Sequence, residues 1–109
     1  MRDDLKYLLY ISENIRRIEE DTAGGRAAFE ASHTIQDAVL HNLQLIGEST
    51  KRLSMARKDS HPQVDWRGIA GFRNFLVRDY MSVDLAVVWQ IVKEDLPSLK
   101  AAVIDMLNE

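Results

Sequence analysis

The sequence contains no cysteine among its 109 residues, and this absence excludes disulfide bonds and thiolate chemistry. It also contains no long hydrophobic run. The longest apolar stretch near the N-terminus, residues 7–11, is too short for the core of a signal peptide. No stretch approaches the length that spans a bilayer. We therefore expect a soluble protein of the cytoplasm.

Neither sign of charge is in large excess. The chain carries 14 Lys and Arg against 17 Asp and Glu, which gives a formal net charge of −3. Such a chain has no overall attraction for nucleic acid, so any RNA binding requires a local basic site. Hydrophobic residues make up 46% and charged residues 28%, which is ordinary for a globular protein. The length suits a single domain over residues 1–109.

Helical periodicity dominates the first half of the chain. Residues 3–20 place apolar side chains every three or four positions, which predicts an amphipathic helix that ends at Gly24-Gly25. A short helical turn over residues 26–31 is expected to follow. The two glycines do not form a phosphate-binding loop, because no strand precedes them and the Lys-Ser/Thr ending is missing.

A second long helix is expected in the middle of the chain. The sequence from Thr34 to Asp37 matches a capping box, and the apolar spacing after it continues to about Met55. Residues 57–64 are polar and contain a proline, so they predict a loop.

The second half of the chain predicts three further helices. Asp65 is the expected N-cap of one, and Ser82 of the next. The apolar run over residues 85–92 is compatible with a buried strand, but its length and the lack of a partner strand favour a helix buried from two sides. The sequence around Pro97 is expected to break that helix, with Pro97 in the first turn of the last one. The prediction is an all-α antiparallel bundle of about five helices, whose surplus apolar surface favours a homodimer.

One polar cluster, in the stretch GFRNFLVRDY over residues 71–80, is a candidate site. On a helix Arg73 and Tyr80 are seven residues apart and point in nearly the same direction, whereas Arg78 lies about 140° round from Arg73. A fraying helix end or a second copy of the chain would bring all three around one pocket, with Asn74 orienting Arg78. The alternative is that both arginines are surface residues favoured by the helix dipole, with Tyr80 half-buried beside them.

The other polar residues give weaker indications of a functional site. His33, His41 and His61 have no metal-ligand spacing, so we expect surface or loop positions and no metal site. Glu48 follows Gly47 in an apolar helix and is expected to pair with Lys51 or Arg52.

The stretch RNFLVRDY resembles the active-site motif of HEPN-domain ribonuclease toxins of the HepT-like family, in which Arg, a polar residue, three residues, His, any residue and Tyr follow one another. Arg73, Asn74 and Tyr80 match this pattern, and the segments before and after it are similar to the family in order and spacing over nearly the whole chain. Arg78 occupies the histidine position, which is the one clear departure.

The resemblance implies a metal-independent endoribonuclease with no cofactor, acting on tRNA or mRNA. Arg73 would contact the scissile phosphate, Tyr80 would orient a phosphate or the 2′-hydroxyl, and Asn74 would support the local hydrogen bonds. Arg78 would offer charge only, since arginine stays protonated and cannot transfer the proton that histidine transfers. The loss of a general acid–base typically costs about 10²–10⁴-fold in rate, so a weakened or inactive enzyme is expected.

The resemblance also implies partners. The family forms homodimers whose two motifs line a shared cleft, and its toxins are neutralised by a minimal nucleotidyltransferase antitoxin that transfers AMP to the motif tyrosine, here Tyr80. Two alternatives stay open from the sequence. One is a non-catalytic module that binds RNA or nucleotide in the same groove, and the other is a structural dimerisation bundle with solvated motif residues.

Overall fold

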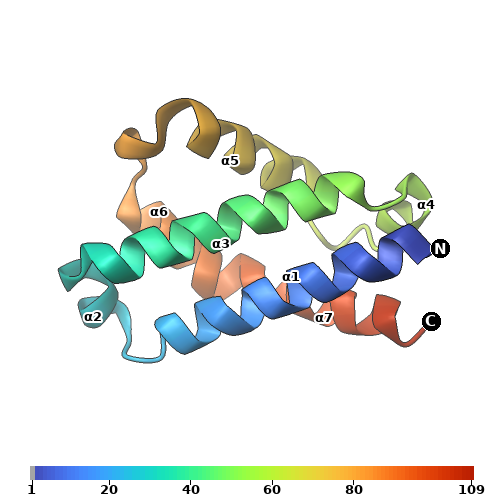
Figure 1. Cartoon of the computed structure of the whole chain (residues 1–109), viewed down its shortest axis with the longest axis horizontal. Coiled ribbons are helices and arrows are strands. Elements are labelled where there is room, and N and C mark those ends of the chain that lie inside the picture. Colours follow the sequence, from blue (N-terminus) through green and yellow to red (C-terminus); the bar gives the residue numbers. More distant parts are fainter. Residues whose placement is uncertain (1) are drawn as a thin grey trace.

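The computed structural model describes residues 2–109, which form helices and short connections without a strand (Figure 1). The all-α prediction is confirmed. The elements are α1 Arg2–Asp21, α2 Arg26–Ala31, α3 His33–Arg52, α4 Met55–Asp59, α5 Trp66–Asp79, the 3₁₀ turn η1 Tyr80–Ser82, α6 Leu85–Gln90, the π-helical segment η2 Ile91–Asp95, and α7 Leu96–Leu107.

Helix α3 is the centre of the arrangement. It runs antiparallel to α1 on one side and to α5 on the other, and these two helices make its most extensive contacts (Figure 1). Helix α7 packs against α1. The core consists of the apolar stripes that these helices turn toward one another, with fully buried members that include Ile11, Ile18, Phe29, Val39 and Val88.

Two helix boundaries in the first half differ from the predicted ones. Helix α3 begins earlier, because the Ser32 hydroxyl, and not that of Thr34, accepts the hydrogen bond from the Ile35 N–H. It ends at Arg52, and the Ser54 hydroxyl then caps α4 by accepting from the Arg57 N–H. Part of the predicted polar loop is therefore helical.

In the second half of the chain, one predicted N-cap is confirmed and the other is wrong. The Asp65 carboxylate accepts from the Gly68 N–H and caps α5 as predicted. The cap of α6 is Asp84, which accepts from the Ala86 N–H, whereas the Ser82 hydroxyl donates to Asp79. Asp84 directly precedes the helix, so its carboxylate is closer than the Ser82 hydroxyl to the free N–H groups of the first turn.

Residues 85–92 are helical as predicted, but the chain does not break before the last helix. Helix α6 continues through η2 into α7, and Pro97 lies in the first turn of α7. A π-helical segment changes the hydrogen-bond pattern just ahead of a residue that has no N–H to donate, so the helical path continues. Burial from two sides is incomplete, because Val87 is 46% exposed.

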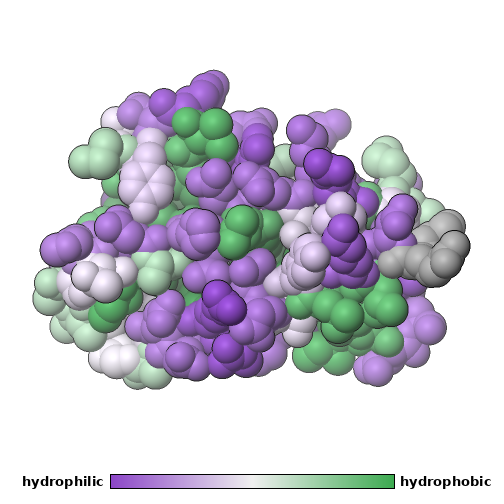
Figure 2. Space-filling model, in the orientation of Figure 1, coloured by the Kyte–Doolittle hydropathy of each residue, from purple (hydrophilic) through white to green (hydrophobic). Residues whose placement is uncertain are grey.

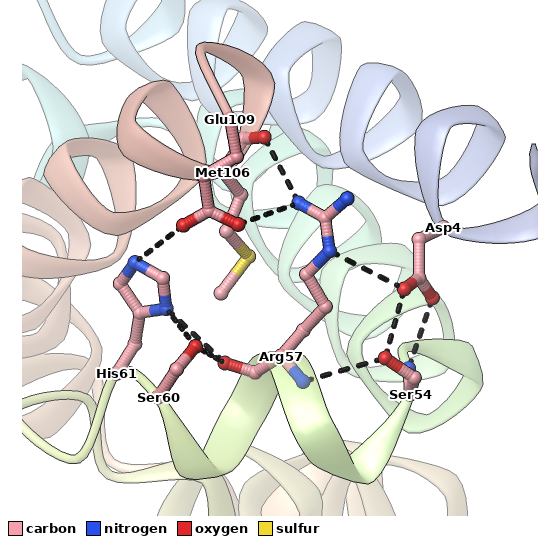
Figure 3. Close-up of polar contacts among 7 residues, drawn as sticks. All are labelled: Asp4, Ser54, Arg57, Ser60, His61, Met106 and Glu109. Atoms are coloured by element: carbon pink, nitrogen blue, oxygen red, sulfur yellow. Dashed lines mark hydrogen bonds and ion pairs between the residues drawn. The ribbon is translucent and has the colours of Figure 1, made fainter. Parts of the chain in front are cut away.

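A polar network joins the start of α1, helix α4 and the C-terminus (Figure 3). Asp4 is 2% exposed, and its carboxylate accepts hydrogen bonds from the Ser54 backbone N–H at 2.9 Å and the Ser54 hydroxyl at 2.8 Å. The Arg57 guanidinium lies 3.5 Å from Asp4 and donates to the Met106 carbonyl and the Glu109 carboxylate.

His61 belongs to the same network. It lies in the loop between α4 and α5, which is one of the two kinds of position predicted for it, but it is buried and not at the surface. Its Nδ1 lies within hydrogen-bond distance of the Ser60 hydroxyl and the Arg57 carbonyl, and its Nε2 lies 3.6 Å from Glu109. The imidazole thus helps to fix the end of α4 against the C-terminus.

Burial alone would raise the pKa of Asp4. The two hydrogen bonds from Ser54 and the charge of Arg57 outweigh this effect and lower the pKa below its ordinary value of 3.8. A lowered folded-state pKa contributes stability that is present above the ordinary value and is lost as the pH falls through the folded-state value.

We expect Asp4→Ala to lower the free energy of unfolding by about 2–4 kcal/mol at neutral pH, because it removes a buried charged acceptor from Ser54 and Arg57. The matched control is Asp3→Ala, whose exposed side chain should contribute less than about 1 kcal/mol. Urea unfolding at pH 7 and at pH 3 measures both. The deficit of the Asp4 variant should shrink in acid, and equal deficits in the two variants would contradict the role of this network.

Candidate functional site

The position of the Arg73 side chain is set by the close approach of α3 and α5. Gly47 of α3 is buried, and a Cβ atom built on it would overlap Cβ and Cγ of Arg73 and lie 3.6 Å from the Ile69 carbonyl oxygen. Only glycine leaves room for α5 at this crossing. The stem of Arg73 therefore lies against the backbone of α3, and its guanidinium emerges at the edge of the two helices.

The Arg73 guanidinium is held loosely and is partly desolvated. Its side chain is 26% exposed, Nη1 donates to the Asn74 side-chain oxygen at 3.2 Å, and Nη2 lies 3.5 Å from the Glu48 carboxylate. Nε is buried and has no hydrogen-bond partner in the described part of the chain. Such a cation is incompletely neutralised by the protein, and its planar donors suit a phosphate.

Two expectations about the neighbours of Arg73 were wrong. Glu48 pairs with Arg73 across the helix crossing and not with Lys51 or Arg52 of its own helix. Asn74 contacts Arg73 and not Arg78. The Glu48 contact follows from the packing of α5 on α3, which the sequence of either helix alone does not specify, whereas the Asn74 contact joins neighbouring residues of α5.

Tyr80 follows the end of α5 and contacts the N-terminal half of α3. Asp79, with φ −151° and ψ 55°, ends the α-helical geometry, and Tyr80 begins η1. The Tyr80 hydroxyl donates to the Asp37 carboxylate at 3.0 Å. Burial, the hydrogen bond to Asp37 and its negative charge raise the pKa of Tyr80 to about 12. The phenol is therefore neutral at physiological pH and acts as a hydrogen-bond donor.

The two carboxylates that hold Arg73 and Tyr80 lie on one face of α3. Asp37 and Glu48 are 11 residues apart, which is close to three full helical turns and about 16 Å along the axis. Because α5 runs antiparallel to α3, Arg73 and Tyr80 lie against that same face at two separate points. Asp37 and Glu48 as partners of the motif were missed by the sequence interpretation.

Arg78 is placed differently from the other two motif residues. Its side chain is exposed, and it makes no hydrogen bond or ion pair with any residue of the range 2–109 that the structure describes. The structure thus brings Arg73 and Tyr80 to one face of α3, whereas Arg78 lies outside that contact within a single chain.

Two general features bear on the type of site. The described residues include no group of three or more His, Cys, Asp or Glu side chains that could hold a metal ion. Within residues 2–109, no helix combines the length and the apolar character needed to cross a membrane.

The family model described as "Ribonuclease HepT-like" matches residues 11–106, which is most of the chain. The chain belongs to the HepT-like ribonuclease family. Its resemblance to HEPN-domain proteins is thereby confirmed, and the motif residues lie inside the matched region.

Several curated proteins are similar to this chain. A "probable ribonuclease HepT" of Thermococcus cleftensis is 40% identical, over 91% of both chains. A "gamma-glutamylcyclotransferase and putative RNase" of Methanocaldococcus jannaschii is 38% identical over the whole of this chain, which spans only 50% of the length of that relative. A "putative RNase" of Caldanaerobacter subterraneus is 26% identical over 98% of its length. No solved structure matches significantly.

We expect Gly47→Ala to force α3 and α5 apart at Arg73. The control is Gly71→Ala on α5, where an added Cβ meets nothing within 4 Å and alanine improves helix propensity. The Gly47 variant should be less stable than the Gly71 variant by about 1–3 kcal/mol in urea unfolding, because the clash involves the rigid base of the Arg73 side chain. Equal stabilities would show that the crossing is not constrained by this glycine.

Proposed function

We propose that this HepT-like domain is a metal-independent endoribonuclease module whose cleavage activity is weakened by Arg78. The observation that carries the proposal is the state of Arg73, a half-buried guanidinium with a buried, unpaired Nε among the described residues and only long contacts to its neighbours. A phosphate group would complete its hydrogen bonds and neutralise its charge.

The proposed reaction is attack of the RNA 2′-hydroxyl on the adjacent phosphorus. It requires a group that accepts the 2′-hydroxyl proton, a donor for the leaving oxygen, and a cation that stabilises the charged transition state. Arg73 supplies the cation. Tyr80 supplies a neutral hydrogen-bond donor, since its pKa is raised to about 12. Arg78 adds positive charge but cannot transfer a proton at neutral pH, so cleavage is slow.

A homodimer is part of the proposal. Large apolar side chains are exposed next to the motif on α5, η1 and α6, namely Val77, Met81 and Val87, at 54%, 90% and 46% exposure. Surface of this kind favours association with a second copy. Two copies joined here would bring two sets of Arg73 and Arg78 into one cleft, which would provide the local positive field that a chain of net charge −3 lacks.

The proposed regulator is a nucleotidyltransferase antitoxin that modifies Tyr80, which makes the domain the toxin half of a toxin–antitoxin pair. The phenolic oxygen would attack the α-phosphorus of ATP, the bond to the β-phosphate would break, and pyrophosphate would leave. The resulting phosphodiester would carry a negative charge beside Asp37, on the face of α3 that Arg73 also contacts. It would repel RNA and occupy the space that a substrate needs.

We expect Arg78→His to restore RNA cleavage, because histidine can transfer protons near neutral pH. The gain should be about 10²–10⁴-fold in the initial rate on a fluorogenic single-stranded RNA, measured with a metal chelator present. The double variant Arg73→Ala with Arg78→His is the matched control and should return to the background rate.

No gain in the Arg78→His variant would overturn the proposed role of this position. The alternative is a non-catalytic RNA-binding module, which the exposed Arg78 and loosely held Arg73 also suit. RNA binding that is lost in Arg73→Ala, without cleavage in any variant, would select that alternative.

For the antitoxin, we expect incubation with a nucleotidyltransferase encoded beside this gene and with Mg·ATP to add AMP to the chain. Intact-mass and peptide mass spectrometry should place the adduct on Tyr80. Tyr80→Phe, which keeps the ring and removes the nucleophile, should gain no mass. An adduct of equal yield on the phenylalanine variant would show that another residue accepts AMP.

A further inference from the structure

A groove on the surface between α1 and α3 is outside the motif. It has a volume of about 410 Å³, and its lining includes Tyr7, Tyr10, Asn14, Arg17, Glu48 and Arg52. Figure 2, in the orientation of Figure 1, looks onto α1 and α3 and shows that hydrophilic side chains cover much of this face. The groove is open to solvent and mixes aromatic, amide and charged groups.

The groove is continuous with the candidate site through one residue. Glu48 lines the groove and also lies 3.5 Å from Nη2 of Arg73. Because α3 separates α1 from α5, a ligand that is bound at Arg73 and crosses α3 at Glu48 enters this groove directly. The groove and Arg73 are therefore two parts of one surface.

The aromatic side chains of the groove offer stacking surfaces. Tyr7 and Tyr10 contact edge to face, with ring centroids 5.9 Å apart and an interplanar angle of 83°. Tyr10 is half-exposed, and the Lys6 ammonium lies 5.3 Å from the Tyr7 centroid and 5.9 Å from the Tyr10 centroid. Aromatic faces beside cations bind the bases and phosphates of single-stranded nucleic acid.

The charges of the groove favour a phosphate at one end. Arg17 is paired with Glu13 at 3.0 Å, so these two groups largely cancel. Arg52 is exposed at the end of α3 and makes no ion pair with another described residue, and Glu48 faces Arg73. Arg52 and Lys6 are thus the cations that can contact a backbone passing over the tyrosines.

We propose that the groove between α1 and α3 binds single-stranded RNA next to the scissile phosphate, with a base stacked on Tyr10 and a backbone phosphate on Arg52. This inference rests on the proposed function, since it assumes that a phosphate of the same strand is bound at Arg73. In this proposal α1, which is distant from the motif in sequence, selects single strands because only they offer an unstacked base.

The test is fluorescence anisotropy with a short fluorescein-labelled single-stranded RNA of mixed sequence. Tyr10→Ala should weaken binding about tenfold, the equivalent of one stacked base. Tyr10→Phe keeps the ring and should bind within about twofold of the unchanged chain. Leu9→Ala is the matched control, because Leu9 is as exposed as Tyr10 and lies outside the groove.

Binding measured over a series of salt concentrations separates the phosphate contact of Arg52 from the base stacking of Tyr10. Arg52→Ala should reduce the slope of log Kd against log salt by about 0.7, as expected for one lost phosphate contact with a single strand. Tyr10→Ala should leave this slope unchanged, because stacking releases no counterions.

The outcomes distinguish this inference from the proposed function. If Tyr10→Ala binds RNA like the unchanged chain while Arg73→Ala binds weakly, the groove is not a binding site but the motif is. If the unchanged chain and its Arg78→His variant bind no RNA, both proposals are wrong. If Tyr10→Ala converts a dimer to a monomer in light scattering, the groove belongs to an interface between copies and the inference is overturned.

Discussion

The close crossing of α3 and α5 at Gly47 is the constraint on which the candidate site depends. Any side chain at this position would push α5 away, because the base of Arg73 already fills the space. The crossing buries Nε of Arg73 and leaves the rest of its guanidinium at the surface. A cation on a freely mobile side chain would be fully hydrated, whereas this one is partly dehydrated before any ligand binds, so less desolvation remains to be overcome on binding.

Helix α3 provides acidic partners to both motif residues that contact it. Glu48 lies beside Arg73, and Asp37 accepts from Tyr80, so two carboxylates alternate with the groups that would bind RNA. The contact to Glu48 is long and leaves the arginine available, whereas the bond to Asp37 has ordinary length and keeps the phenol protonated. An anionic ligand would compete with these carboxylates, which makes binding sensitive to where each phosphate is placed.

The structure separates this surface from the network that joins the chain ends. Asp4, Ser54, Arg57 and Glu109 tie α1, α4 and the C-terminus together (Figure 3). Asp37, which accepts from Tyr80, lies in the first half of α3, whereas Ser54 follows the end of that helix. Within the described residues, none of the four that join the chain ends makes a hydrogen bond or ion pair with Arg73 or Tyr80. Arg78 is exposed, so its charge costs little desolvation in the fold.

The amino-acid sequence specifies the helical class, the apolar stripes, the Asp65 cap and the motif positions, because periodicity and capping are local properties. It misplaced the caps at Ser32 and Asp84, where competing polar residues lie within a turn of one another. The contact between Glu48 and Arg73, the burial of His61 and the hydrogen bond from Tyr80 to Asp37 arise from the packing of the helices. Those contacts join residues far apart in the chain, and they depend on how closely two helices can approach, which no single helix encodes.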